Sequence, residues 1–225
     1  MGGSITHPEP RARRAALAAF LAELEAALRD VAATVDPGTA GSLSEFVRLV
    51  RSIDLDVATP ESAASPARLP VCRFWEQSLA AATPRRVVSS LRSLAVSLSW
   101  AQNPNYRRSP PDATFLDNYG YAVIAGPTDG PPALATDPRL ALGVLLLGPR
   151  AHYPLHAHPA VEIYYTLTPE CEWWRGDGPW RHEPPGAVIH HAPNVRPATR
   201  AGASPLLAIH LWRGDLATHA KLTQG

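Results

Sequence analysis

Two histidines and one glutamate are spaced so that they could bind a metal ion together. His156 and His158 are two positions apart, and Glu162 follows four residues after the second histidine. Residues two apart on a β strand project from the same face, and a turn at Pro159–Ala160 would bring the next strand back beside the first. Two imidazole nitrogens and a carboxylate oxygen that converge inside a barrel suit Zn, Fe, Mn or Ni.

Other polar side chains lie close to this group in the sequence. Tyr164 comes two positions after Glu162, so the two side chains would share one face of a strand. The chain has nine histidines, most of them in its last third, although a single histidine on a strand is usually structural. His190 and His191 are adjacent and would point to opposite faces of a strand, so only one of them could face the site.

The region that carries these residues has the pattern of an all-β fold. From about residue 110, prolines and glycines separate short runs rich in Val, Ile, Tyr and Trp, which is typical of closely spaced strands. The expected strands are 119–125, 140–147, 161–167, 171–175, 187–191 and 206–213. Gly176-Asp177-Gly178 predicts a hairpin. Short strands with no helices between them favour an antiparallel sandwich or a small barrel.

The first half of the chain is predicted to be helical. One helix is expected over 15–35, and a second is expected to begin at a capping box formed by Ser42 and Glu45. A third is expected over 71–82, and a fourth with Thr83 as N-cap and Pro84 at its first position. We therefore expect a helical region over 1–110 and a β-barrel domain over 111–225. The apolar faces of the helices would form core or a subunit interface, so a homodimer is possible.

Composition excludes several classes of function. Lys plus Arg number 21 and Asp plus Glu number 20, a net charge of +1, which indicates neither a nucleic-acid partner nor an anionic membrane. Lys221, near the C-terminus, is the only lysine, which argues against a Schiff-base enzyme. Two cysteines make no disulfide framework, and no apolar run is long enough to span a membrane. We expect a cytoplasmic protein.

The metal-site residues resemble the first cupin motif, and Pro185-Gly186-x-x-x-His190 resembles the opening of the second. More narrowly, the chain resembles the cupin-type dimethylsulfoniopropionate (DMSP) lyase family. The stretches that carry this resemblance are 69–73 (LPVCR), 115–121 (FLDNYGY), 146–149 (LLGP), 152–160 (HYPLHAHPA), 174–180 (WRGDGPW), 184–191 (PPGAVIHH), 205–208 (PLLA) and 211–216 (LWRGDL). The resemblance implies a mainly β fold, a cupin (double-stranded β-helix) barrel with a helical N-terminal region.

The resemblance also implies an activity, the cleavage of DMSP into dimethyl sulfide and acrylate. In such enzymes a divalent metal binds the substrate carboxylate and a tyrosine removes the adjacent α-proton. Carried over by position, His156, His158 and Glu162 would be metal ligands. Tyr164 would be a ligand or the general base, and Tyr153 would assist the base or hold the substrate.

The sulfonium end of DMSP is a cation that hydrogen bonds serve poorly. An aromatic face could hold it by cation–π attraction, worth roughly 0.5–2 kcal/mol. Among the aromatic residues of this half of the chain, Tyr121 and Trp174 are our candidates for substrate binding.

The chain departs from the family pattern at the end of the second motif. The expected ligand histidine falls on Arg196 or Pro197, and neither can bind a cation. Three hypotheses follow. Water completes a three-ligand site, or His210 or His190 substitutes, or the metal is lost and Arg196 binds a carboxylate by a bidentate pair.

The leading interpretation is a metal-dependent carbon–sulfur lyase that acts on a small carboxylate, DMSP. One alternative is a cupin that binds a small carboxylate through a degraded metal site and has no lyase activity. The other is a different metal-dependent cupin enzyme. The tyrosines Tyr153 and Tyr164 favour the lyase, because neither is needed merely to hold a metal.

Overall fold

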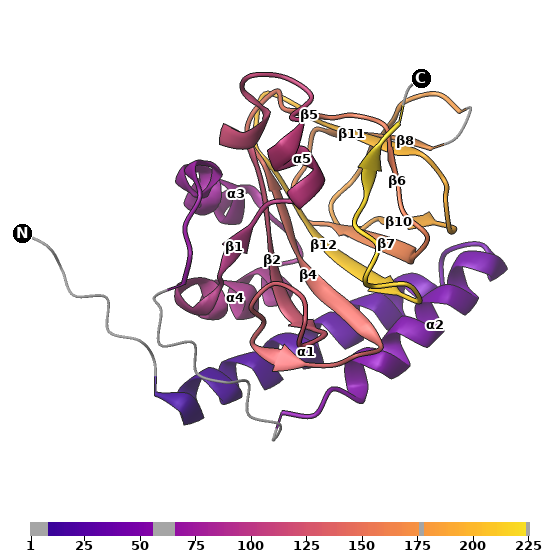
Figure 1. The fold of residues 1–225 in the computed structure, drawn as a ribbon. Coiled ribbons are helices and arrows are strands. Elements are labelled where there is room, and N and C mark those ends of the chain that lie inside the picture. The colour runs from indigo at the N-terminus through magenta and orange to yellow at the C-terminus, as the bar shows by residue number, and fades with distance from the viewer. Residues whose placement is uncertain (1–8, 56–65, 176–177, 224–225) are drawn as a thin grey trace, which may run out of the picture.

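A computed structural model describes residues 9–55, 66–175 and 178–223 (Figure 1). Helices precede the long strands in the chain, as expected. They are α1 (Pro10–Ala32), α2 (Pro37–Arg51), α3 (Trp75–Ala81), α4 (Arg85–Leu94) and α5 (Pro104–Arg108), with 3₁₀ turns at Pro70–Phe74, Ala95–Ser97 and Phe115–Asp117. None of the described helices is long and apolar enough to cross a membrane.

Two helices begin at residues other than those predicted. The N-cap of α2 is Asp36, whose side chain accepts a hydrogen bond of 3.0 Å from the Thr39 amide, so Ser42 lies inside the helix rather than at its start. Asp36-Pro37 therefore follows one helix and caps the next. The N-cap of α4 is Pro84, whose carbonyl accepts a hydrogen bond from the Val88 amide, while the Thr83 amide donates to the Leu167 carbonyl.

The strands form three hydrogen-bonded sheets. Their bounds are β1 (Trp100–Ala101), β2 (Tyr119–Gly126), β3 (Ala135–Thr136), β4 (Leu140–Leu147), β5 (His152–Tyr153), β6 (His156–Ala157), β7 (Val161–Thr166), β8 (Cys171–Arg175), β9 (Arg181–Glu183), β10 (Val188–His191), β11 (Pro197–Ala201), β12 (Leu206–Arg213) and β13 (Lys221–Leu222). A seven-stranded sheet has the order β1-β2-β4-β12-β7-β10, with β3 beside β2. A four-stranded sheet has the order β5-β11-β8-β9, and β13 pairs with β6.

Six of these strands, β2, β4, β7, β8, β10 and β12, correspond to the six predicted runs. The sequence analysis did not identify the remaining strands, of which β11 has five residues and the others two or three. The predicted hairpin lies partly outside the described residues, since Gly176 and Asp177 are not among them. The strands that flank it, β8 and β9, pair antiparallel.

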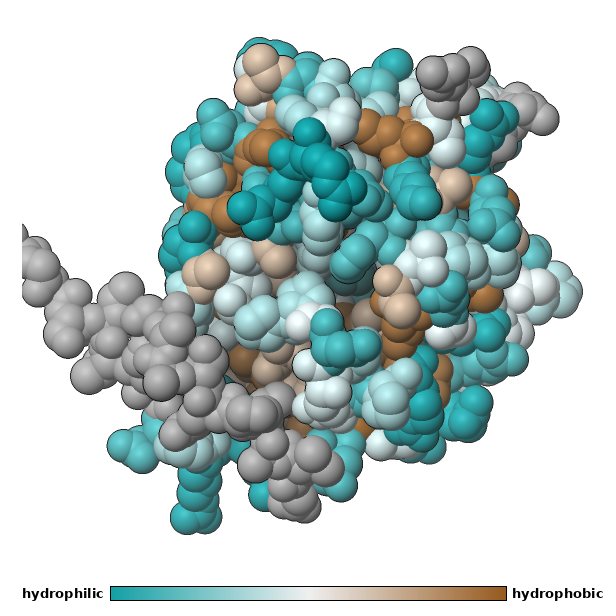
Figure 2. Space-filling model, in the orientation of Figure 1, coloured by the Kyte–Doolittle hydropathy of each residue, from teal (hydrophilic) through white to brown (hydrophobic). Residues whose placement is uncertain are grey.

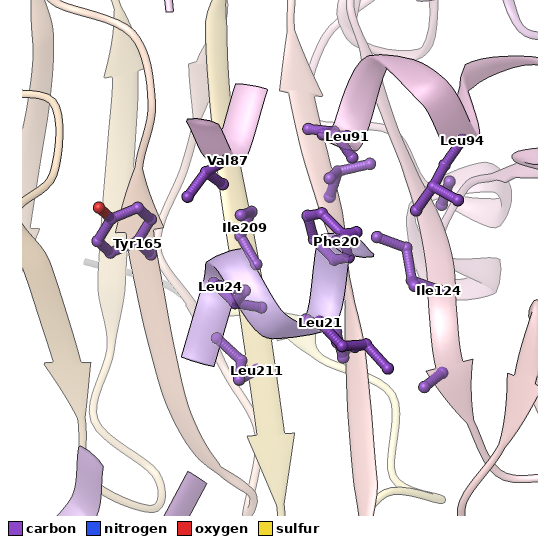
Figure 3. Packing of buried hydrophobic residues seen from close by; sticks show 14 of the residues in the cluster. Phe20, Leu21, Leu24, Val87, Leu91, Leu94, Ile124, Tyr165, Ile209 and Leu211 are labelled. Carbon is purple, nitrogen blue, oxygen red and sulfur yellow. The ribbon is translucent and has the colours of Figure 1, made fainter. Parts of the chain in front are cut away.

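The large sheet separates two hydrophobic clusters, because alternate residues of its strands face opposite sides. On β12, Ile209 and Leu211 belong to a cluster shared with the helices, whereas Ala208 belongs to the cluster between the sheets. Figure 3 shows Leu24 of α1 beside Ile209 and Leu211. The helices thus cover one face of the sheet, and the opposite face is free to carry the site.

This packing accounts for the apolar faces of the N-terminal helices. The buried residues of α1 lie in the same cluster as sheet residues of this chain, so its apolar face is core. A homodimer therefore stays a prediction without support from these faces. On the side shown in Figure 2, hydrophobic residues form separate small patches. Among the described residues, Val96 is the one large hydrophobic side chain that is exposed, at 40%.

The mainly antiparallel sheets and the helical N-terminal region agree with the predicted mainly β cupin fold, but among the described residues the strands form three separate sheets rather than one closed barrel. The division at residue 110 stays a prediction. The first strand of the large sheet, β1, comes before that residue, and one cluster joins helices and sheet.

Candidate metal centre and cavity

Glu162 is brought to the centre of a histidine group by its position in the sheet. It lies on β7, whose two neighbours are β10 and β12. The register pairs Glu162 with His191 on β10 and with Trp212 on β12. His156 on β6 and His158 precede the turn that leads into β7, as the spacing predicts.

Three side-chain nitrogens meet at the Glu162 carboxylate, which is completely buried. Its Oε2 lies 3.1 Å from His158 Nε2 and 3.2 Å from His191 Nδ1. Its Oε1 accepts a hydrogen bond from the indole nitrogen of Trp212. Burial alone would raise the pKa of Glu162, but His158 and His191 lower it well below the usual range by charge and hydrogen bonding. Glu162 is therefore ionised at neutral pH.

The histidines retain nitrogen atoms suited to further bonds. His156 Nδ1 lies 2.9 Å from the Pro154 carbonyl, and a carbonyl only accepts, so Nδ1 carries the proton and Nε2 has the free lone pair. Three ring nitrogens are buried without a hydrogen-bond partner, and these are Nε2 of His156, Nδ1 of His158 and Nε2 of His191. Burial lowers the pKa of His156 to about 4, so its imidazole is in the neutral, metal-binding form at pH 7.

We tested whether these residues suit the divalent metal that the cupin fold implies. Within the described parts of the chain, no group of three or more His, Cys, Asp or Glu is arranged to hold a metal as it stands. The ring centroids of His156 and His158 are 6.5 Å apart, and His158 is paired with Glu162 instead. The donor chemistry nevertheless fits, since neutral imidazoles, a carboxylate and an unpartnered buried His156 Nε2 are what such ions bind.

Two aromatic rings pack directly on the histidines. The Tyr153 ring stacks on His156 with centroids 4.0 Å apart and an angle of 2° between the planes. The Trp212 indole stacks on His158 with centroids 3.9 Å apart. These contacts limit rotation of both imidazoles and so help to orient their nitrogens.

A cavity of about 170 Å³ opens beside this group. Its lining residues include Glu162 and a set of aromatic side chains, which are Tyr119, Tyr121, Tyr153, Tyr164 and Trp212. Among the described lining residues there is no lysine or arginine, and Asp129 adds a carboxylate. The cavity is therefore suited to a small molecule with an apolar or cationic part.

The two predicted tyrosines are buried and protonated in this form of the protein. Burial, the charge of Glu162 and a hydrogen bond with that carboxylate raise the pKa of Tyr164 well above the ordinary value of 10. Burial likewise raises the pKa of Tyr153, and its hydroxyl lies 3.1 Å from the hydroxyl of Tyr106 on α5. Neither tyrosine can act as a base at neutral pH unless a nearby cation lowers its pKa.

The other predicted site residues fall into two groups. Tyr121 and His210 line the cavity, and burial lowers the pKa of His210 to about 4. Trp174 is half-buried and Arg196 is exposed, and both lie outside the described lining of the cavity. His190 is half-buried on the face of β10 opposite to His191, and its carbonyl accepts a hydrogen bond from Arg175.

The sequence analysis missed two contributors. His191 could not be told from its neighbour His190 without the register of β10 against β7, which pairs His191 with Glu162. Tyr106 lies far from the motifs in the sequence and reaches Tyr153 from a five-residue helix. No pattern in the sequence marks either contact.

Comparison with known proteins identifies the family. A family model described as dimethylsulfoniopropionate lyase matches residues 44–208. The DMSP lyase DddQ of Ruegeria pomeroyi is 32% identical over 182 residues, which is 81% of this chain and 86% of that protein. A crystal structure of DddQ from the same organism superposes with a TM-score of 0.68 at 27% identity and covers 92% of this chain and 96% of that one.

A second structure, from work on the DMSP lyases RdDddP and RnDddQII, has a TM-score of 0.67 at 21% identity and supports the fold. It covers 94% of this chain and 100% of that chain. The family model spans most of the chain, and the DddQ relative exceeds 30% identity over more than four fifths of it. The chain therefore belongs to the dimethylsulfoniopropionate lyase family.

Proposed function

We propose that this protein is a metal-dependent lyase that cleaves DMSP into dimethyl sulfide and acrylate. The observation that carries the proposal is the charge of the cavity. DMSP has a carboxylate, yet the described lining offers no lysine or arginine to bind it, and the Glu162 carboxylate would repel it. A divalent cation held at Glu162 supplies the missing positive charge.

His156, His158 and Glu162 are the residues that would hold this ion, a divalent transition metal such as Zn, Fe, Mn or Ni. When bound, the metal supplies a Lewis acid that binds the substrate carboxylate and stabilises negative charge developing beside it. The stacked rings of Tyr153 and Trp212 hold the two imidazoles in place.

Tyr164 is the proposed base. Its phenolate oxygen takes the proton from the α-carbon, and the electrons of that C–H bond form the new C=C bond. The bond between the β-carbon and sulfur breaks, and its electron pair leaves on sulfur as dimethyl sulfide. Burial and the charge of Glu162 hold the pKa of Tyr164 well above its ordinary value, so the same cation is needed to make this tyrosine a base.

The opposite end of the substrate is a dimethylsulfonium cation, and the cavity provides aromatic faces for it. Tyr121 and Trp212 both line the cavity. The ring centroids of Tyr121 and His210 are 6.2 Å apart. The carboxylate of Asp129 adds a favourable charge. Trp174 lies outside this lining, so Tyr121 is the better candidate.

Two alternatives explain less. A carboxylate-binding protein without metal would rely on Arg196, which is exposed and outside the described lining. Another metal-dependent cupin enzyme could use the same ligands, but no observation here favours a different substrate. Both cysteines are free, which agrees with the proposed cytoplasmic location.

Headspace gas chromatography for dimethyl sulfide tests the proposal. The purified protein, supplemented in turn with Zn, Mn, Fe and Ni, is expected to release dimethyl sulfide from DMSP with at least one of them. We expect Tyr164→Phe to lower this rate at least about 100-fold, the lower bound for losing a general base. Tyr165→Phe is the matched control, because Tyr165 follows on the same strand but faces the helices. No dimethyl sulfide with any metal overturns the function, and full activity of Tyr164→Phe overturns its role.

Tyr106→Phe is expected to lower the lyase rate through Tyr153. The variant removes a buried hydroxyl that lies 3.1 Å from the Tyr153 hydroxyl, and the lost bond costs about 1 kcal/mol. The Tyr153 ring, which stacks on His156, is then held less firmly. Thermal unfolding and the headspace assay together give the readout. An unchanged rate would show that Tyr106 serves folding alone.

A further inference from the structure

We infer that His191 supplies the imidazole ligand that the second cupin motif of this chain lacks. The inference rests on the proposed metal dependence and adds a residue to the metal site. It modifies the second of the three hypotheses for the missing histidine, because it assigns the substitution to a residue other than His210 and His190.

The first step is that the residues at the expected ligand position, Arg196 and Pro197, offer no atom that can bind a metal. Pro197 begins β11 and its side chain is buried and has no atom that binds a metal, while Arg196 is exposed. Pro197 and the rest of β11 pair with β5 and β8, whereas Glu162 lies on β7. A replacement ligand must therefore come from another element.

The second step is the position of His191. It is the last residue of β10 and lies directly opposite Glu162 in the register of the large sheet. Its Nδ1 and His158 Nε2 approach the same oxygen, Glu162 Oε2, at 3.2 Å and 3.1 Å. A carboxylate oxygen only accepts, so both nitrogens donate to it, and the free lone pair stays on His191 Nε2 and on His158 Nδ1.

The third step is burial. The His191 side chain is 1% exposed, and its second nitrogen, Nε2, has no hydrogen-bond partner. A buried imidazole with an unpartnered nitrogen is costly, and such a cost is usually explained by a ligand, an ion or a water. His210 and His190 lack this combination. Neither ring nitrogen of His210 is among the described buried atoms without a hydrogen-bond partner, and His190 is half-buried on the opposite face of β10.

His191 could instead act only through its hydrogen bond to Glu162, and the experiment must separate the two roles. Pulsed electron paramagnetic resonance of the Cu²⁺-loaded protein counts the imidazoles bound directly to the metal. We expect three for the native protein, from His156, His158 and His191, and two for His191→Gln. The affinity for Zn²⁺, measured by competition with a chelating dye, is expected to fall at least about 10-fold in that variant.

His190→Gln is the matched control, since it removes the adjacent histidine from the opposite face of β10, and His210→Gln tests the other candidate. Both are expected to keep three bound imidazoles. Thermal unfolding verifies that each variant is folded. Pro197→His in the His191→Gln background places a histidine at one of the two positions where the family pattern has its ligand, and it is expected to restore the third imidazole.

A count of two in the native protein, or a count unchanged in His191→Gln, would overturn the inference. Because these readouts require no DMSP, they are separate from the test of function. Three imidazoles without release of dimethyl sulfide would support His191 and contradict the lyase. Release of dimethyl sulfide with two imidazoles would do the reverse, and no bound metal would overturn both.

Discussion

Glu162→Gln is expected to weaken the affinity for Zn²⁺ more than about 100-fold and to abolish the release of dimethyl sulfide. Glu162 is the one carboxylate in the group and meets His158, His191 and Trp212 at once. Removing an outer partner of a metal ligand already costs about 10- to 100-fold in affinity, and here the ligand itself loses its charge. Dye competition and the headspace assay measure the two effects.

The glutamine variant should remain folded, because it keeps the shape of the side chain and removes a buried charge. Glu172→Gln is a suitable control. Glu172 lies on β8 and is partly exposed, and its Oε1 is 3.6 Å from Nε2 of His182. The variant therefore removes the charge of a Glu–His pair that lies outside the described lining of the cavity. Native-like affinity in Glu162→Gln would place the metal elsewhere in the chain and contradict the proposed site.

Gly143→Ala should be the most destabilising of the single methyl additions in the described sheet. Gly143 lies in β4 between β2 and β12, and an added Cβ would stand 2.2 Å from the Ala122 carbonyl oxygen and 2.6 Å from His210 Cε1. Because one neighbour is backbone of a central strand, it cannot simply turn away. We expect a loss of about 3 kcal/mol in the free energy of unfolding.

That loss corresponds to a fall in Tm of about 6–12 °C for a chain of this size, measurable by scanning calorimetry. Gly41→Ala is the matched control, because Gly41 is exposed within α2 and an added Cβ there would contact nothing within 4 Å. That variant is expected to be neutral or stabilising by up to about 1 kcal/mol, since alanine favours helix. Equal effects of the two substitutions would argue against the close contact at Gly143.

Much of the fold could be predicted from local patterns. The six strands that were predicted agree with the expected runs to within one residue at either end, because each is a run of β-formers bounded by prolines and glycines. The arrangement of His158 and Glu162 on either side of a turn also followed from spacing alone. Most of the other strands have two or three residues, which carry too little pattern, and β11 begins with a proline and contains no run of strand-forming residues.

The rest depended on contacts between distant segments. Which of His190 and His191 faces Glu162 is decided by the pairing of β10 with β7, and shifting that pairing by one residue would exchange them. The start of α2 at Pro37 depended on whether Asp36 or Ser42 captures a free amide. The exclusion of Trp174 and Arg196 from the cavity lining likewise follows from tertiary packing, which no local signal reports.

The two-sided character of the large sheet has a consequence for how this protein could change over generations. On β12, Trp212 and His210 line the cavity, whereas Ile209 and Leu211 pack on the helices. Mutations at alternate positions of one strand are thus under different selection, for the chemistry of the cavity on one face and for packing against the helices on the other. A mutant library restricted to the cavity-facing positions of β7 and β12 would therefore search for new substrates while the helix-facing positions preserve the fold.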